Sequence, residues 1–135
     1  GDKADDIYTD FVSSLKENIS KIREMEGAPE TFRKLKSKEV SVVVSTGFPL
    51  DVAEPLVDHL GWISDGLVDS WICSELVGAS RPDPAMILDS MKRYTVDDPG
   101  IVIKVDDTMK GIEEGRNAGV YTIAVLTFRN KQCAV

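Results

Sequence analysis

Hydrophobic residues along the chain follow two alternating spacings, which predict helices and strands in turn. Apolar residues three and four positions apart predict amphipathic helices, and short runs rich in β-branched residues predict strands. Helices that alternate with strands predict an α/β fold with a parallel sheet. Because crossovers between parallel strands are right-handed, the carboxyl ends of the strands should meet at one edge of that sheet. We expect helices over 4–22, 29–35, 50–60, 84–94 and 111–118, and strands over 40–44, 67–73, 101–105 and 121–126.

Two hydroxyl residues follow the first predicted strand. Ser45 and Thr46 come directly after 40–44, and Gly47 stands between them and the next predicted helix. Hydroxyls beside the backbone amides of a helix start are a common way to hold a phosphate. A capped helix without any ligand explains the same stretch equally well, so both interpretations stay open at this point.

A pair of acids follows the strand predicted at 101–105. That run is almost continuous in β-branched residues, which is typical of a strand covered on both faces. Asp106 and Asp107 then repel each other unless a cation or several donors neutralise them, which indicates a magnesium-type site. The alternative is a helix cap, in which Asp107 or Thr108 satisfies the first amides of the helix at 111–118. Spacing alone favours neither.

One cation stands in the loop that follows the second strand. Arg81 lies between Ser80 and Pro82, so its backbone is biased toward an extended conformation. A guanidinium group can fork onto a phosphate or a carboxylate, although an ordinary surface arginine is the simpler explanation. Since the hydroxyls, this arginine and the paired acids all follow strands, we expect them to converge at the same edge of the sheet.

Charge and composition exclude several classes of partner. The formal charge is −7, with 23 acidic and 16 basic residues, so most of the surface should repel nucleic acid. No apolar run approaches the length of a membrane-spanning helix, and no signal peptide opens the sequence. Cys73 and Cys133 lack the spacing of a metal site. We therefore expect a cytoplasmic protein without disulfides, membrane contacts or nucleic-acid partners.

Three segments resemble the haloacid dehalogenase superfamily, and within it the phosphonoacetaldehyde hydrolase or phosphonatase-like branch. They are STGFPLDVAEPLVDHLGW at 45–62, SRPDPAMIL at 80–88 and KVDDTMKGIEEGRNAG at 104–119. The resemblance implies a three-layer, Rossmann-like parallel sheet. It also implies a hydrolase of small phosphorylated or phosphonate compounds, which transfers a phosphoryl or phosphonyl group to an aspartate with the help of Mg²⁺ and breaks a P–C or P–O bond.

The resemblance also implies roles for individual residues. Ser45 would bind the transferring phosphoryl group, with Thr46 and Gly47 lending backbone. Arg81 would be the catalytic cation that offsets phosphoryl charge. Asp106 and Asp107 would hold Mg²⁺. Residues 1–27 would correspond to the end of the family's cap domain and a linker, and residues 28–135 to its core.

The sequence departs from the family pattern in the acidic motif. The commoner form is Gly-Asp-Thr with another aspartate four residues later, whereas here Asp106 replaces the glycine and Gly111 replaces the later aspartate. Our hypothesis is that Asp106 supplies the carboxylate lost at 111.

The family's first motif, a strand that ends in an aspartate nucleophile, has no counterpart before Val40. Most of the cap is missing as well, and Lys104 is not placed to form the imine used by phosphonoacetaldehyde hydrolases. We expect the core part of a hydrolase, either a fragment or a shortened gene product, with little or no turnover of its own. The alternative is a non-catalytic relative that binds a phosphorylated ligand or a partner protein.

The missing first strand would lie at the centre of the family's sheet, between the strands at 40–44 and 101–105. Its loss would leave unpaired backbone groups on both neighbours. We expect either that these two strands close up or that another chain fills the position, and a homodimer is one such arrangement.

Overall fold

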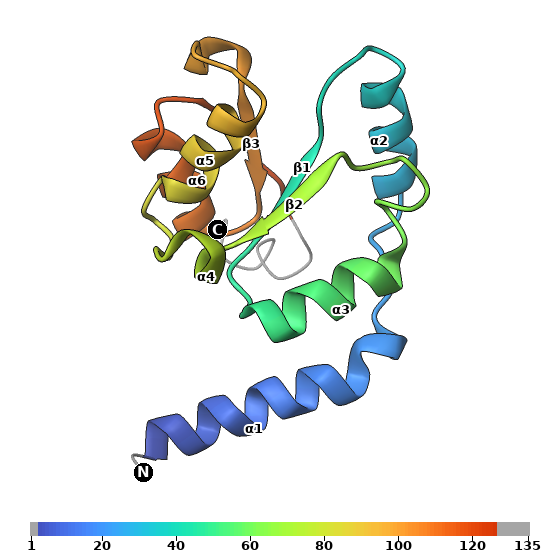
Figure 1. Ribbon diagram of the computed structural model, residues 1–135, viewed down its shortest axis with the longest axis vertical. Coiled ribbons are helices and arrows are strands. Elements are labelled where there is room, and N and C mark those ends of the chain that lie inside the picture. The colour runs from blue at the N-terminus through green and yellow to red at the C-terminus, as the bar shows by residue number, and fades with distance from the viewer. Residues whose placement is uncertain (1–2, 127–135) are drawn as a thin grey trace. The chain divides into compact units, whose positions relative to one another are not determined.

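The computed structural model describes residues 3–126, which form two compact units that meet in sequence at Cys73 and Ser74 (Figure 1). The first unit contains α1 (Lys3–Asn18), η1 (Ile19–Lys21), α2 (Ala28–Lys36), β1 (Val43–Thr46), α3 (Leu50–Leu60) and β2 (Ser70–Cys73). The second unit contains α4 (Ser74–Val77), α5 (Ala85–Arg93), η2 (Pro99–Ile101), β3 (Ile103–Asp106), α6 (Met109–Asn117) and β4 (Tyr121–Ala124).

Each unit is built on a pair of parallel strands. In the first unit β1 pairs with β2, so that Val43 lies opposite Ser70. In the second unit β3 pairs with β4, so that Ile103 lies opposite Tyr121. The parallel pairing and the alternation of helices with strands confirm the predicted α/β class. What occupies the position of the missing central strand stays a prediction.

The first strand begins later than the hydrophobic pattern predicts. It covers Val43–Thr46 instead of 40–44, so Ser45 and Thr46 belong to the strand and do not follow it. The reason lies in the backbone of 40–42. The Val40 amide donates to the carbonyl of Leu35 and closes the end of α2, and the Val42 amide donates to the carboxylate of Asp69 at 2.7 Å.

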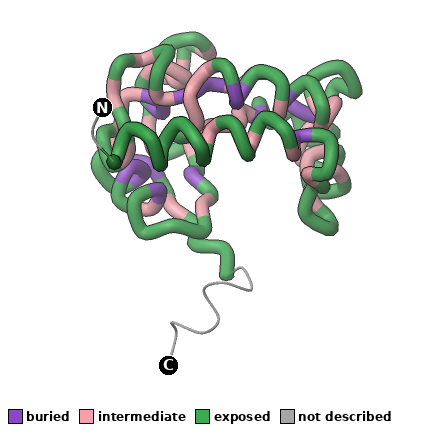
Figure 2. Tube along the Cα trace, turned by 90° about the horizontal axis from the view of Figure 1, so that it is seen from below, coloured by how far each residue is buried: buried purple, intermediate pink, exposed green. Residues whose placement is uncertain are grey.

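The N-terminal helix is less buried than its apolar stripe suggests. It ends at Asn18, earlier than the predicted 22, and passes into the short helix η1. Figure 2 shows α1 exposed along most of its length, and Ile7, Tyr8 and Phe11 are all exposed. An ion pair between Lys16 and Asp51 links it to α3.

The core of the first unit lies between α3 and β2. The buried side chains of Val52, Ala53 and Val57 come from one face of α3, and Ile72 and Cys73 come from β2. Cys73 is a free, fully buried thiol, whereas Cys133 lies outside the described residues. None of the described helices combines the length and the apolar character that a membrane crossing needs.

Glycines in the left-handed conformation follow two of the helices. Gly61 follows α3 in the left-handed conformation with φ of 69°, and its amide donates to the carbonyls of Val57 and Asp58. Gly119 follows α6 with φ of 75°. Side chains with a Cβ are disfavoured at such angles, so both positions suit glycine.

Candidate functional site

Thr46, at the end of β1, makes a local contact. The side-chain oxygen of Thr46 accepts a hydrogen bond from the Phe48 amide at 3.2 Å. Gly47 is exposed, and an added Cβ there would meet no atom within 4 Å. The Thr46 contact is of the kind that organises a turn before a helix, whereas Pro49, the N-cap of α3, makes no side-chain cap hydrogen bond. The predicted phosphate contacts of Ser45, Thr46 and Gly47 stay predictions.

In the second unit, α6 lies directly on the sheet because its inner face carries two glycines. A Cβ added at Gly115 would come well within 3.0 Å of the Thr122 side chain, and one added at Gly111 would come equally close to the carboxylate of Asp106. Real Cβ atoms essentially never come so near. The helix begins after Thr108, whose side-chain oxygen accepts from the Gly111 amide at 3.1 Å, so Thr108 is the cap that the sequence offered as one alternative.

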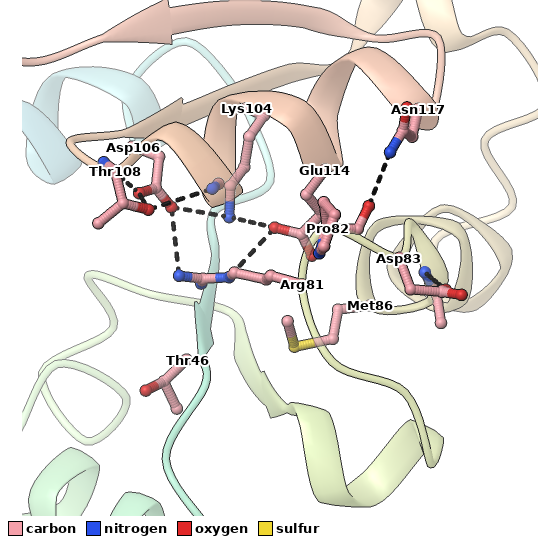
Figure 3. A network of polar contacts seen from close by, with 12 residues as sticks. Thr46, Arg81, Pro82, Asp83, Met86, Lys104, Asp106, Thr108, Glu114 and Asn117 are labelled. Atoms are coloured by element: carbon pink, nitrogen blue, oxygen red, sulfur yellow. Dashed lines mark hydrogen bonds and ion pairs between the residues drawn. The ribbon is translucent and has the colours of Figure 1, made fainter.

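The close approach of α6 assembles four charged side chains, which we call the four-charge cluster: Arg81, Lys104, Asp106 and Glu114 (Figure 3). One oxygen of Glu114 lies 3.0 Å from Lys104 Nζ and 3.2 Å from Arg81 Nε. One oxygen of Asp106 lies 3.3 Å from Lys104 Nζ and 3.4 Å from Arg81 Nη1. Cations and carboxylates therefore alternate around a closed ring.

The ring of ion pairs compensates a deeply buried charge. Glu114 is 0% exposed and Lys104 is 8% exposed. Within the described part of the chain, Oε1 of Glu114 has no hydrogen-bond partner, so the ion pairs to Lys104 and Arg81 are what offset its desolvation. A buried ion whose partner is removed is strongly destabilising, which makes the members of the cluster interdependent.

Asp106 is engaged through both of its carboxylate oxygens. Its Oδ1 accepts hydrogen bonds from the Thr108 amide at 2.9 Å and from the Thr108 hydroxyl at 2.7 Å, while Oδ2 faces the two cations. Burial alone would raise the pKa of Asp106, but the bonds from Thr108 and the charges of Arg81 and Lys104 outweigh it and hold that pKa below its ordinary value. The group is therefore an oriented carboxylate at neutral pH.

Two contacts hold the loop that carries Arg81. The side-chain amide of Asn117, at the end of α6, donates to the carbonyl of Pro82 at 2.9 Å. Asp83 accepts from the Ala85 amide at 2.9 Å, where α5 begins. The structure thus brings together two of the predicted site residues, Arg81 and Asp106, whereas the predicted Ser45, Thr46 and Gly47 belong to the first unit.

The paired acids offer the donor chemistry that Mg²⁺ prefers. Asp107 is exposed beside the partly buried Asp106, and both supply carboxylate oxygens. Among residues 3–126 no group of three or more His, Cys, Asp and Glu side chains is arranged to hold a metal. Mg²⁺ is commonly held by only one or two carboxylates, with waters and substrate phosphate completing its shell. These two acids therefore fit that ion in kind and number.

Sequence reasoning missed Lys104 and Glu114 and was wrong about how β3 is covered. Ile103 and Val105 are 58% and 54% exposed, whereas Lys104 is buried. Within the second unit α6 covers the face that Lys104 and Asp106 share, and the β-branched residues point to the other face. The alternation of side chains along a strand places residues 104 and 106 together, and the spacing of Gly111, Glu114 and Gly115 places Glu114 on the buried face of α6.

The chain is similar to known proteins in sequence and in fold. A family model for haloacid dehalogenase-like hydrolases matches residues 2–119. Phosphonoacetaldehyde hydrolase from Bordetella avium is 31% identical over 126 residues, which are 92% of this chain and 44% of that protein. The crystal structure of a phosphonoacetaldehyde hydrolase-like protein from Oleispira antarctica matches with a TM-score of 0.80 and 26% identity, covering 100% of this chain and 52% of that one.

A hydrolase from Streptococcus pneumoniae shares the fold, with a TM-score of 0.67 at 15% identity over 87% of this chain and 60% of that one. The chain spans about half the length of the curated relatives it matches. The family model covers most of the sequence, and the relatives confirm the predicted branch. The chain therefore belongs to the haloacid dehalogenase-like hydrolases and is phosphonatase-like within that family.

Proposed function

We propose that this chain supplies the metal-binding and phosphoryl-binding part of a hydrolase that acts on a small phosphonate or phosphate ester and breaks its P–C or P–O bond. The observation that carries the proposal is the pairing of Arg81 with Asp106 at the carboxyl end of β3, at 3.4 Å, in a chain similar to phosphonoacetaldehyde hydrolases. A guanidinium group held by carboxylates beside a strand end is suited to binding a phosphoryl or phosphonyl oxygen.

Each residue has a separate task in this proposal. Asp106 and Asp107 would hold Mg²⁺, which when bound would supply positive charge to the oxygens of the reacting group. Arg81 binds and orients the phosphoryl oxygens, since its position is fixed by the four-charge cluster. Ser45 would donate its hydroxyl to a phosphoryl group, with the backbone of Thr46 and Gly47 beside it.

The proposed reaction also needs an aspartate nucleophile, and no segment before Val40 has the form of a strand that ends in such a residue. We therefore propose that the 135-residue chain turns over little or no substrate by itself. A non-catalytic relative that binds a phosphorylated ligand or a partner protein is the alternative. An assay of the chain with a generic phosphate ester and Mg²⁺ tests the expected inactivity. Appreciable turnover that Asp107→Asn abolishes would refute it.

The metal site can be tested without turnover. Mn²⁺, a paramagnetic substitute for Mg²⁺, should broaden the amide NMR signals around Asp106–Thr108 in the ¹⁵N-labelled chain, and excess Mg²⁺ should reverse the broadening. Asp107→Asn should weaken the effect at least about tenfold, the scale of losing one charged ligand. Asp97→Asn, an equal charge change at an exposed acid before β3, is the matched control. Equal broadening in all three proteins would contradict the assignment of the metal to this pair.

A further inference from the structure

We propose that Glu114 makes anion binding at Arg81 depend on a bound divalent cation, by cancelling positive charge that Arg81 and Lys104 would otherwise offer. This inference rests on the proposed function of the same site, and it assigns a task to a residue that has no role in the family resemblance. Glu114 is 0% exposed, so it would not touch a bound anion or metal ion itself. It would act on them only through its ion pairs to Arg81 and Lys104.

Glu114 is among the largest fully buried side chains of the described residues, but packing does not require its charge. The buried residues of α6 are Gly111, Glu114 and Gly115, so the inner face of this helix buries no apolar side chain. An ionised carboxylate at such a place must be compensated, and an apolar residue of similar volume often packs there at no loss of stability. The volume of the Glu114 side chain contributes to packing, but an uncharged side chain of that volume would pack as well. What the carboxylate adds is one negative charge, 3.2 Å from Arg81.

The charges of the cluster decide how it meets an anion. Arg81 and Lys104 contribute two positive charges, and Asp106 and Glu114 contribute two negative ones, so the four charges sum to zero. A phosphate oxygen that approaches the Arg81 guanidinium thus finds hydrogen-bond donors, but the four-charge cluster as a whole carries no net positive charge to attract it. Adding a divalent cation at Asp106 and Asp107 changes the sum to positive and favours the anion. By linkage, the anion must then strengthen metal binding by the same factor.

The test is a titration of the full ¹⁵N-labelled chain with orthophosphate, followed through the Nε–H signal of Arg81. It is run once in EDTA and once with saturating Mg²⁺, with ionic strength matched by NaCl. In the wild-type chain we expect phosphate to bind at least about tenfold more tightly with Mg²⁺, the order expected from added charge at close range. Glu114→Gln should raise phosphate affinity in EDTA by roughly tenfold and shrink the gain from Mg²⁺.

Two further variants isolate the charge from its surroundings. Glu113→Gln makes the same change at the exposed neighbour on α6, and it should leave both affinities within about twofold of wild type because exposed charges are screened. Lys104→Gln changes the charge in the opposite direction and should weaken phosphate binding in EDTA. Far-UV circular dichroism establishes which variants fold. If Glu114→Gln does not fold, the inference is overturned by a wild-type chain that binds phosphate equally well with and without Mg²⁺.

The outcomes separate this inference from the proposed function. If phosphate fails to bind the wild-type chain even with Mg²⁺, the proposed function fails. If phosphate binds equally well with and without Mg²⁺, or if folded Glu114→Gln binds it no more tightly in EDTA, the inference about Glu114 is overturned while the phosphate site stands. Tighter binding by Glu114→Gln, together with an unchanged Glu113→Gln, supports it.

Discussion

Replacing Gly111 with alanine tests whether the four-charge cluster depends on the close approach of α6. The new Cβ would lie well within 3.0 Å of the Asp106 carboxylate, so that group must move. It is held by two hydrogen bonds from Thr108 and by ion pairs to Arg81 and Lys104, and moving it disturbs all four contacts.

The magnitude follows from opposing terms. Overpacking costs about 1 to 3 kcal/mol, a lost hydrogen bond to a charged group costs about 1.5 to 3, and alanine in a helix gains about 1 over glycine. We therefore expect Gly111→Ala to lower the free energy of unfolding by about 2 to 4 kcal/mol. Urea unfolding followed by far-UV circular dichroism measures the loss, and hydrogen exchange of the α6 amides shows whether it arises in the second unit.

A double-mutant cycle identifies the cause. In an Asp106→Gly background the obstructing side chain is absent, so Gly111→Ala should be neutral or stabilising by up to about 1 kcal/mol. Gly47→Ala is the control for adding a methyl group at a glycine, because no atom lies within 4 Å of its Cβ position and its φ is not positive. If Gly111→Ala costs the same in both backgrounds, to within about 0.5 kcal/mol, the coupling between Asp106 and Gly111 is refuted.

Three other outcomes can be measured in the same way. Gly115→Ala should destabilise the second unit by about 1 to 3 kcal/mol, because the new methyl group would collide with the Thr122 methyl group. Thr122→Ser removes the Thr122 methyl and should restore most of the lost stability. No restoration would contradict the assigned contact. Folding lowers the pKa of Asp106, so the stabilisation from this carboxylate is fully present above the unfolded pKa of 3.8 and is lost as the pH falls through the folded pKa. The free energy of unfolding should therefore fall over this acidic range, and Asp106→Asn should flatten that part of the acid-unfolding profile. An unchanged slope in Asp106→Asn would argue against this role of Asp106. Asp69 should show the same pH dependence, since burial tends to raise its pKa but the bonds from Lys36 and the Val42 amide lower it. Asp69→Asn should also speed hydrogen exchange of the Val42 amide, whereas the control Asp65→Asn should not.

The sequence predicted four strands and five helices in the order that the structure has them, because each has a strong local signal, but it missed the short helices α4 and η2. Gly61 and Gly119 end helices where the backbone needs a left-handed residue, and Thr108 caps α6. The start of β1 was wrong because the side chain of Asp69, 27 residues away, takes the amide of Val42, and hydrophobic patterns carry no trace of such a bond. Local patterns therefore predicted most of the elements but not the limits that distant side chains impose.

The candidate site was predictable only in part, for a similar reason. Asp106 stands at the end of a strand and Arg81 in a loop, where polar residues are candidates for binding, and the structure joins them in an ion pair. Lys104 stands among β-branched residues, which suggested a strand buried on both faces. Deciding which face of β3 is covered requires knowing where α6 lies, and that depends on Gly111 and Gly115, whose missing side chains give no hydrophobic signal.

The exchange of residues at 106 and 111 links these observations. In the commoner family pattern the acid stands on the helix and the glycine on the strand, whereas here the Asp106 carboxylate fills the space beside Gly111. A carboxylate that projects from the strand lies beside Lys104, the residue two positions earlier on the same face, and is drawn toward Arg81 as well. The Asp106 carboxylate thus pairs with Lys104 as well as with Arg81, and the buried Glu114 supplies the second negative charge that balances these two cations. On this argument Asp106, Gly111, Lys104 and Glu114 form one physical unit, in which a change at one position requires compensation at another.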